Sequence, residues 1–509
     1  MSSTATSETE FFATQHVKAD LKGRSVRGGV ATLAGQSANF VIQTASTVIL
    51  ARLLTPADYG MIAMITAVTG FVTLFKDLGL SMATVQKDEI THEQISMLFW
   101  INVGLSAVVM LVTMALAPVI AWFYGEPDLL PLTLVMAVGF VFGGLCVQHS
   151  ALLRRQMRFG TLVLIDILRL IVSATVGIIA ALAGAGVWAL VYMTLSGNLF
   201  NALAVWVVCH WRPSLPAFGA GVRVMLAFGA NLTGFNIVNY FSRNLDNLLI
   251  GRFCTADILG FYNKAYNLLL LPIQQISGPV TAVALPALSR LQDQPERFKS
   301  FYKKGVLLIA FVSMPVVLLM FTVSDLVILI VLGSQWASVT TIFRLLMPAA
   351  FIGAFNVATG WVYVSLGQTD RQFRMGIVNA IAATLGFVIG IRWGAIGVAS
   401  SFSIVSCILL YPRLWYCFRR SPLHVHDLLS VLWKPCVASM VACVLVFLIR
   451  RIVLLNCVMA AKFAVESSTF GLFYVLVWCL IPKGRDTLYE VLQIVRDLRP
   501  HQRELRECI

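Results

Sequence analysis

Long uncharged apolar stretches recur along this chain and limit what it can fold into. Val103–Tyr124, Leu170–Val191 and Val306–Val323 contain no Asp, Glu, Lys or Arg. A helix of about 20 mostly apolar residues is long enough to cross the hydrocarbon core of a bilayer. The chain as a whole is 58% hydrophobic and 12% charged, whereas soluble domains are about 45–50% apolar and about 25% charged. The sequence therefore predicts an all-α polytopic membrane protein.

About fourteen membrane spans can be placed along the chain. They cover approximately 28–51, 58–82, 97–122, 129–151, 160–183, 187–209, 223–250, 257–289, 304–332, 337–366, 373–391, 394–418, 428–449 and 463–482. No soluble domain interrupts this series. The first apolar run follows a polar, basic segment without the pattern of a cleavable signal peptide, so we expect a retained first span.

Basic residues are distributed unevenly between the two sides of the predicted spans. If the N-terminus lies inside the cell, the inside segments carry 26 Lys and Arg and the outside segments carry six. Cytoplasmic loops are enriched in Lys and Arg, so we expect both termini to be cytoplasmic, with Arg450 and Arg451 as a local exception. The same rule explains the net charge of +14, and we expect no nucleic acid partner.

Cysteine and histidine show no pattern of a disulfide framework or a metal site. The ten cysteines are scattered singly, mostly in apolar runs, where cysteine behaves as a small hydrophobic residue. The seven histidines do not cluster, apart from His424 and His426 in a basic loop. We therefore expect no disulfide, no metal and no cofactor.

Short phrases recur at similar separations in the two halves of the chain. Arg155–Gly160 reads RQMRFG, and Arg371–Gly376 reads RQFRMG, 216 residues later. At a shift of 200, Asn39, Arg52, Thr55 and Gly60 correspond to Asn239, Arg252, Thr255 and Gly260, and at a shift of 210 GAG at Gly184 corresponds to GAIG at Gly394. Self-similarity at a near-constant period indicates duplicated units. Two six-span repeats enter the membrane from the same side, so they would be related by an axis along the membrane normal, as in several transporters.

The duplication predicts two six-helix lobes followed by two added helices. The expected parts are a cytoplasmic N-terminal segment 1–27, a first lobe 28–210, a cytoplasmic linker 211–222, a second lobe 223–418, the added helices in 419–482 and a cytoplasmic tail 483–509. In the tail, Leu488, Val491, Leu492, Val495 and Leu498 share one helical face. This stripe predicts an amphipathic helix on the inner membrane surface.

Charged side chains inside the predicted spans are the main candidates for a substrate site, because each costs about 2.5–3.5 kcal/mol to place in hydrocarbon on insertion scales. The predicted substrate-binding cations are Lys76, Arg169, Arg243, Lys264 and Arg344, and the accompanying acids are Asp77, Asp166 and Asp246. Asp166–Arg169 and Arg243–Asp246 are spaced i, i+3, so mutual neutralisation is an alternative role for these pairs. For Lys264 and Arg344 the alternative is snorkelling to the interface. Asp325, Lys434 and Glu466 are weaker candidates.

The predicted spans 223–250 and 257–289 are unusually rich in Asn and Tyr. Asn239 in the first span and Tyr266 in the second are the candidate substrate-binding residues among them. A lipid-facing helix could not carry such groups, so we expect them to line a wet cavity or a helix interface. Asn and Tyr suit sugar hydroxyls, whereas cations suit phosphate oxygens through charge-assisted hydrogen bonds.

Two glycine patterns do not predict nucleotide binding. Gly184–Ala189 reads GAGVWA, but it joins two apolar spans and no strand precedes it. Gly386–Gly390 reads GFVIG, which fits close helix packing better than a ligand loop.

Two stretches resemble a known family. LARLLTPADYGMIAM at Leu50–Met64 with FKDLGLSMATVQK at Phe75–Lys87 forms the first, and LGFYNKAYNLLLLPIQQISGPVTAVALPALSRLQ at Leu259–Gln292 forms the second. They resemble the Wzx-type polysaccharide flippases of the multidrug/oligosaccharidyl-lipid/polysaccharide (MOP) exporter superfamily, in the branch that exports colanic acid, succinoglycan and similar exopolysaccharides. The resemblance covers the first twelve spans and weakens after Arg420. It implies two lobes around a cationic cavity, but it carries no strict substrate-site signature, so the site residues above depend on the charge argument.

The expected function is therefore transport and not enzymatic catalysis. The resemblance implies a flippase that moves undecaprenyl-diphosphate-linked oligosaccharides across the bacterial inner membrane for exopolysaccharide or lipopolysaccharide biosynthesis. Its expected partners are the lipid-linked oligosaccharide, membrane lipids, and the polysaccharide polymerase and chain-length machinery. A coupling ion, H⁺ or Na⁺, remains open. The alternatives are a multidrug or cation antiporter of the same superfamily, and a membrane-bound polymerase or ligase of lipid-linked sugars.

Overall fold

All regular structure in the described part of the chain is helical, as predicted. The computed structural model describes residues 21–73, 81, 84–85, 90–215, 240, 244–453 and 459–498. Two compact units divide the chain, 1–260 and 261–509, here called the first and second unit. The predicted linker at 211–222 lies partly outside the described residues, so the predicted lobe boundaries stay predictions.

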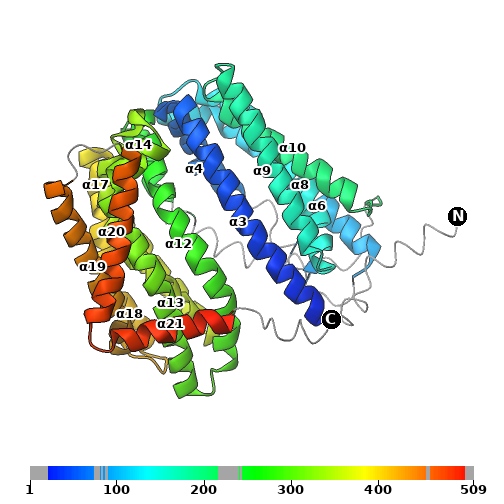
Figure 1. The fold of residues 1–509 in the computed structure, drawn as a ribbon. Helices are drawn as coiled ribbons and strands as arrows, with labels where there is room; N and C mark the ends of the chain where they lie inside the picture. Colours follow the sequence, from blue (N-terminus) through cyan, green and yellow to red (C-terminus); the bar gives the residue numbers. More distant parts are fainter. Residues whose placement is uncertain are drawn as a thin grey trace. The chain divides into compact units, whose positions relative to one another are not determined.

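The first unit is a bundle of long apolar helices (Figure 1). Its helices are α3 (Leu21–Leu53), α4 (Pro56–Thr73), α6 (His92–Tyr124), α7 (Leu129–Ala137), α8 (Gly139–Arg155), α9 (Phe159–Leu182) and α10 (Trp188–Val208). A further helical stretch covers 244–253. Helix α9 packs between α3 and α10, and α8 packs between α6 and α10. Because apolar side chains cover these helices on most sides, packing and not amphipathicity decides which face is inside.

Local sequence signals explain where α6 begins and ends. The Thr91 side chain accepts from the backbone of Gln94, whose side chain accepts in return from the backbone of Thr91. This capping box satisfies two amide groups that the helix itself cannot pair. At the other end Gly125 adopts a left-handed conformation, φ 74°, which glycine reaches without steric cost.

The second unit contains the remaining helices and a large apolar core. Helix α12 (Ala256–Arg290) begins in the first unit and continues into the second. The other helices are α13 (Pro295–Thr322), α14 (Ser324–Val331), α15 (Val339–Ser365), α16 (Thr369–Gly390), α17 (Gly394–Ile408), α18 (Leu410–Phe418), α19 (Val425–Val453), α20 (Met459–Leu480) and α21 (Gly484–Leu498), with short 3-10 turns at Ser334–Trp336 and Ile391–Trp393. Helix α13 packs against α15 and α19, and α17 packs against α15 and α16.

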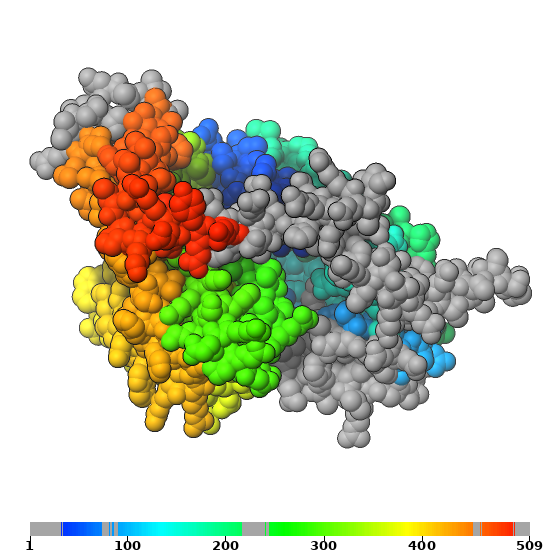
Figure 2. Space-filling model, turned by 60° about the horizontal axis from the view of Figure 1, so that its bottom comes forward, coloured from blue at the N-terminus to red at the C-terminus, as the bar shows by residue number. Residues whose placement is uncertain are grey.

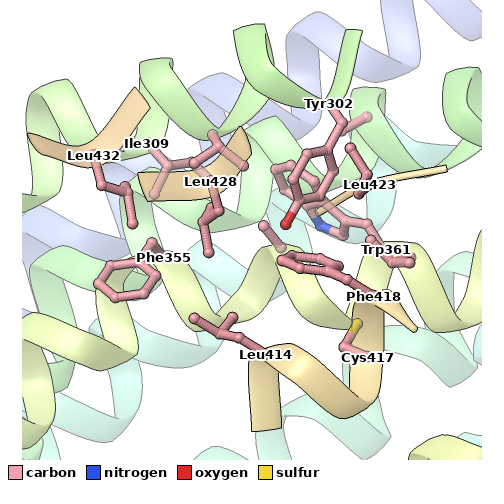
Figure 3. Close-up of a cluster of buried hydrophobic side chains, with 14 of the residues drawn as sticks. Tyr302, Ile309, Phe355, Trp361, Leu414, Cys417, Phe418, Leu423, Leu428 and Leu432 are labelled. Atoms are coloured by element: carbon pink, nitrogen blue, oxygen red, sulfur yellow. The ribbon is translucent and has the colours of Figure 1, made fainter. Parts of the chain in front are cut away.

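Aromatic rings fill the core of the second unit where α13, α15 and α18 meet (Figure 3). The ring centroid of Tyr302 lies 6.4 Å from that of Trp361 and 6.1 Å from that of Phe418, both edge to face. Leu428 on α19 packs into the same cluster. The added helix α19 is therefore part of this core and not a loose attachment to it.

The C-terminal helix α21 lies across the ends of neighbouring helices of the second unit and at its surface (Figures 1 and 2). It contacts α13 and α20, and its Val491 is buried. On α19, the Lys434 ammonium donates to the Lys483 carbonyl at 3.1 Å and to the Thr487 hydroxyl at 2.8 Å. The predicted tail helix is therefore present, whereas its place on the inner membrane surface stays a prediction.

Ten helical stretches within the described residues are long and apolar enough to cross a membrane. One of them, Thr369–Phe418, contains two of the predicted spans. Helix α3 covers predicted span 28–51, and helix α4 covers the first part, 58–73, of predicted span 58–82. Most of predicted span 223–250 lies outside the described residues. The chain is thus a multi-pass membrane protein, and the exact number of fourteen stays a prediction.

The echo at a shift of 200 marks equivalent positions in the fold. Helix α4 begins at Pro56 and α12 begins at Ala256, 200 residues later. A Cβ added to Gly60 would lie 1.8 Å from the Ala256 carbonyl oxygen, and a Cβ added to Gly260 would lie 2.0 Å from the Pro56 carbonyl oxygen. The two contacts are thus reciprocal, as a two-fold relation between duplicated helices requires.

The echo that repeats RQMRFG as RQFRMG does not mark equivalent positions. Helices α9 and α16 begin at Phe159 and Thr369, a shift of 210, not 216. As a result Arg155 ends α8, whereas Arg371 lies in the first turn of α16. Both arginines are nonetheless buried and donate to a backbone carbonyl, of Thr84 and Tyr416 respectively. The duplication is supported by the shifts of 200 and 210, and not by this phrase.

The GFVIG segment packs closely against a neighbouring helix, as predicted. A Cβ added to Gly390 would lie 2.5 Å from the Gly397 carbonyl oxygen, and one added to Gly386 would lie 2.9 Å from the Val405 side chain. The first four residues of GAGVWA, Gly184–Val187, lie in the turn between α9 and α10, and Trp188 begins α10. No strand precedes it in the described residues, so the fold gives no support to a nucleotide site there.

We expect Gly60→Ala and Gly260→Ala each to destabilise the purified protein. Each new methyl group would overlap a backbone carbonyl, and overpacking of this kind costs about 1–3 kcal/mol. Gly104→Ala on α6 is the control, because no atom lies within 4 Å of its added Cβ. Thermal unfolding of the detergent-solubilised variants measures the effect. If Gly60→Ala unfolds at the same temperature as Gly104→Ala, the close contact between α4 and α12 is not important for stability.

Candidate functional site

Three of the seven predicted site residues lie outside the described residues. They are Lys76, Asn239 and Arg243. Their roles stay predictions, as does the pairing of Arg243 with Asp246. The structure places the other four, Arg169, Lys264, Tyr266 and Arg344, on three helices.

Arg169 pairs with an acid on its own helix. Its Nε lies 3.1 Å from Asp166 Oδ1 on α9, and the two side chains are 33% and 54% exposed. The i, i+3 spacing predicted this contact. The contact fits the alternative of mutual neutralisation, while the role of Arg169 in substrate binding stays a prediction. Because the pair is not deeply buried, Arg169 can still turn toward an anion, but it carries little net charge where it stands.

Tyr266 belongs to a row of rings on α12. It stacks on Tyr262, with ring centroids 6.3 Å apart, and its ring meets the edge of Phe402 on α17 at 6.2 Å. Half-buried Lys264 lies on the same helix, between Tyr262 and Tyr266 in sequence. The Asn267 amide donates to the Asn263 side-chain oxygen at 2.7 Å. Helix α12 therefore presents aromatic, amide and ammonium groups within two turns, as the sequence predicted for this span.

Arg344 is the predicted cation whose surroundings the structure describes most fully. It lies on α15, and its Nε donates to the Ser324 hydroxyl at 2.7 Å. Its Nη2 is 3.8 Å from Asp325 Oδ1, too far for a hydrogen bond, and its side chain is 40% exposed. Its Nη1 and Nη2 groups make no hydrogen bond to any described residue. Arg344 therefore keeps the pair of donors that can bind two phosphate oxygens at once.

Asp325 is held mainly by a second arginine, Arg450, which comes from α19. The two Arg450 Nη groups donate to the two carboxylate oxygens of Asp325, at 3.2 Å to Oδ1 and by a short contact to Oδ2. Arg450 Nη1 also donates to the Thr322 carbonyl at the end of α13, at 3.3 Å. On its other side, Arg450 Nε lies 3.5 Å from Glu466 Oε1 on α20, whose side chain is fully buried. One guanidinium thus joins α13, α14, α19 and α20.

The sequence argument missed this network, although it named several members. It ranked Asp325 and Glu466 as weak candidates and treated Arg450 only as an exception to the distribution of basic residues. In the structure the exception has a reason, because Arg450 neutralises two acids at the predicted outer ends of neighbouring spans. The predicted surplus of positive charge is also absent here, since Arg344 and Arg450 face two carboxylates. One signal in the sequence could have predicted this network. Arg450 lies on the predicted outer side, close to the depth in the membrane predicted for two acids, Asp325 and Glu466.

A second ionic contact ties α19 to α13 at the opposite end. Asp427 Oδ1 lies 2.8 Å from Lys299 Nζ and 2.9 Å from Lys303 Nζ. Its other oxygen accepts from the His424 amide at 3.0 Å, which caps α19. The added helix α19 is therefore fastened by charge at both ends.

Two buried polar residues on α8, Gln148 and His149, form another group that the sequence argument did not single out. His149 is fully buried and stacks on Trp206, with ring centroids 4.6 Å apart. The neighbouring Gln148 side chain accepts from the Thr84 hydroxyl at 2.9 Å. Both lie within the first unit, where Gln148 contacts Thr84 and His149 packs among aromatic rings. We assign them a structural role.

A family model described as "polysaccharide biosynthesis protein" matches residues 49–341, which include all the stretches that carry the resemblance. The lipopolysaccharide biosynthesis protein WzxC of Escherichia coli is 26% identical over 71% of this chain and 74% of its own length. The teichuronic acid biosynthesis protein TuaB of Bacillus subtilis is 26% identical over 74% of this chain and 78% of its own length. The succinoglycan biosynthesis transport protein ExoT of Rhizobium meliloti is 22% identical over 81% and 83%.

Solved structures show the same fold. The lipid II flippase MurJ in an inward closed conformation has a TM-score of 0.73 and covers 91% of this chain and 100% of its own, at 14% identity. An inward-facing multidrug resistance MATE transporter of the MOP superfamily has a TM-score of 0.60 and covers 75% and 94%. The all-α membrane fold expected from the sequence is therefore confirmed. Since the family model matches more than half of its length, the chain belongs to the polysaccharide biosynthesis protein family.

Proposed function

We propose that this protein flips undecaprenyl-diphosphate-linked oligosaccharide repeat units across the bacterial inner membrane. The observation that carries the proposal is the family match over residues 49–341 on a fold shared with a lipid II flippase over 91% of the chain. The relatives named above serve lipopolysaccharide, teichuronic acid and succinoglycan biosynthesis. The product would enter exopolysaccharide or lipopolysaccharide biosynthesis, with a polymerase and chain-length machinery acting next.

The described residues supply the chemistry that such a substrate needs. Arg344 has two Nη groups available for phosphate oxygens, and Lys264 adds a second cation on α12. The partly exposed ring of Tyr266, which stacks on the buried ring of Tyr262, offers a flat apolar surface for a sugar ring. Alternating access of the two lobes would expose the bound head group first to the cytoplasm and then to the outside, while the lipid tail stays in the bilayer.

Two other functions lead to different expectations. A multidrug or cation antiporter shares the fold, as the MATE structure illustrates, but it would need acidic residues that face the cavity and have no cationic partners. In the described residues Asp166, Asp325 and Asp427 each lie in an ion pair. A polymerase or ligase would need an outer domain for sugar chemistry, and the connections described on the predicted outer side are short.

Expression of this chain should restore polymer export in a strain that lacks the flippase for a polysaccharide of matching repeat unit. Lipid-linked repeat units should then leave the cytoplasmic leaflet and appear as polymer at the surface. A strain lacking the polymerase is the control for enzymatic activity and should not be rescued. Restored resistance to cationic drugs without restored polymer would favour the antiporter instead.

Replacing Arg344 by Gln should lower export about tenfold or more, because hydrogen bonds to charged groups contribute about 1.5–3 kcal/mol. Alanine at Arg169, Arg243 or Lys264 should also lower it. Arg392→Gln is the matched control, since this arginine is exposed and lies outside the predicted spans. Export per unit of protein in the membrane is the measurement. Wild-type export by all four site variants would contradict the proposed site.

The membrane potential should drive the transport step. An outward move of two negative charges gains about 4–5 kcal/mol at 100 mV, inside negative, if they cross the whole field. Flipping of a fluorescent lipid-diphosphate in proteoliposomes should therefore slow when valinomycin and potassium collapse the potential. If the rate is unchanged without a potential but falls when a proton or sodium gradient is removed, ion antiport drives the step.

A further inference from the structure

We propose that Arg450 keeps Asp325 from neutralising Arg344, and so leaves the Arg344 guanidinium able to bind a phosphate-bearing substrate. This inference assumes the proposed flippase function and adds a positioning residue to its site. It also gives the added helix α19 a task in transport, since Arg450 is its contribution. The evidence is the way in which two arginines share one carboxylate.

Asp325 lies between the two arginines but pairs unequally with them. Both of its oxygens accept from Arg450, whereas Arg344 Nη2 stays 3.8 Å from Oδ1. Arg344 is turned aside by its hydrogen bond from Nε to Ser324, 2.7 Å long. A carboxylate bound on both oxygens by one guanidinium attracts a second guanidinium less strongly.

Arg450 is held by several contacts, so it is less free than Arg344 to bind a substrate anion. Its Nη1 donates to the Thr322 carbonyl at the end of α13. Its Nε lies 3.5 Å from the carboxylate of Glu466, which is 1% exposed. With a helix terminus and a buried acid as further partners, its side chain is only 21% exposed. Arg344, at 40%, is the more accessible arginine of the pair.

Loss of Arg450 would change the balance at Arg344. Ser324 and Asp325 are adjacent at the start of α14, which packs against α15. The Arg344 guanidinium would then need to move only about 1 Å to bind Asp325 directly, since charged hydrogen bonds are about 2.7–2.9 Å long. In a low-dielectric setting such a pair competes with the substrate phosphate for the same two donors.

The alternative is that Arg450 has only a structural role and links four helices. In the proposal, which we call the shield, Arg450 keeps Asp325 away from Arg344; the structural alternative we call the staple. The two roles make different predictions for a variant that lacks the Asp325 charge. Under the shield, removal of the Asp325 charge makes Arg450 dispensable. Under the staple, removal of Asp325 takes away one more contact and cannot restore function.

The test compares Arg450→Gln/Glu466→Gln with the triple variant that adds Asp325→Asn. The double variant removes Arg450 together with its buried acidic partner, so no unpaired charge is left at Glu466. Export per unit of membrane protein should fall about tenfold in the double variant, as it would for a lost charged hydrogen bond. It should return to within about twofold of wild type in the triple variant. Equal or lower export in the triple variant overturns the proposal.

Asp427→Asn is the matched control, because it breaks the ionic contact of α19 with α13 at the other end of α19. Any loss of export that it causes should not be restored by adding Asp325→Asn. If restoration occurs there too, Asp325→Asn acts as a general stabiliser and the proposal fails. Membrane protein levels and unfolding temperature are recorded for every variant.

A second measurement does not depend on export. Phenylglyoxal labelling of Arg344, followed by mass spectrometry on purified protein, should drop severalfold in the double variant and recover in the triple variant. If the double variant does not accumulate, Arg450→Lys replaces it, since one ammonium cannot bind both Asp325 oxygens in the same planar geometry. Unchanged labelling in whichever of these variants is purified overturns the proposal.

These outcomes separate this inference from the proposed function. Rescue of a flippase-deficient strain by the wild-type chain tests the function and does not involve Arg450. If rescue succeeds and Arg344→Gln exports normally, the chain is a flippase with a different site, and the inference falls alone.

Discussion

A charge placed among membrane helices must have a partner, and this requirement organises the ionic network of the second unit. In the second unit Arg450 joins the end of α13 to the start of α14 and to α20, and it does so through acids that would be costly to bury alone. The same network sets how much positive charge remains available at Arg344. Helix packing and substrate chemistry therefore depend on the same few side chains.

The repeated sequence positions also correspond to close helix contacts in the fold. The reciprocal contacts of Gly60 with Ala256 and of Gly260 with Pro56 bring backbone against backbone, which side chains would prevent. Such a contact is possible only when both copies keep the small residue. Helices α19 and α20, which the sequence predicts to lie outside the duplication, are held within the second unit by ionic contacts at both ends of α19.

Much of the fold could be predicted because a long apolar run in a chain of this composition forms a membrane-spanning helix. The positions at which helices break within those runs were not predicted. Predicted spans 129–151, 304–332 and 394–418 are each interrupted, by Val138, Val323 and Leu409 respectively. Gly139 follows the first break and Pro412 lies three residues after the third, whereas no Pro or Gly lies within three residues of Val323. Only the break at Val323 therefore lacks a local signal. The path is set by neighbouring helices, whose packing outweighs the small differences in helix propensity among apolar residues.

The site divides in the same way. The sequence alone determined the pair Asp166–Arg169, because residues three apart on a helix are neighbours whatever surrounds them. It also determined which spans are polar and that Arg344 is a candidate. Only the tertiary structure decided that Asp325 meets Arg450, 125 residues away, and that Arg344 is left 3.8 Å from the same carboxylate. Long-range pairing follows from how four helices pack, and packing depends on the shape of many side chains together, which no single stretch of sequence contains.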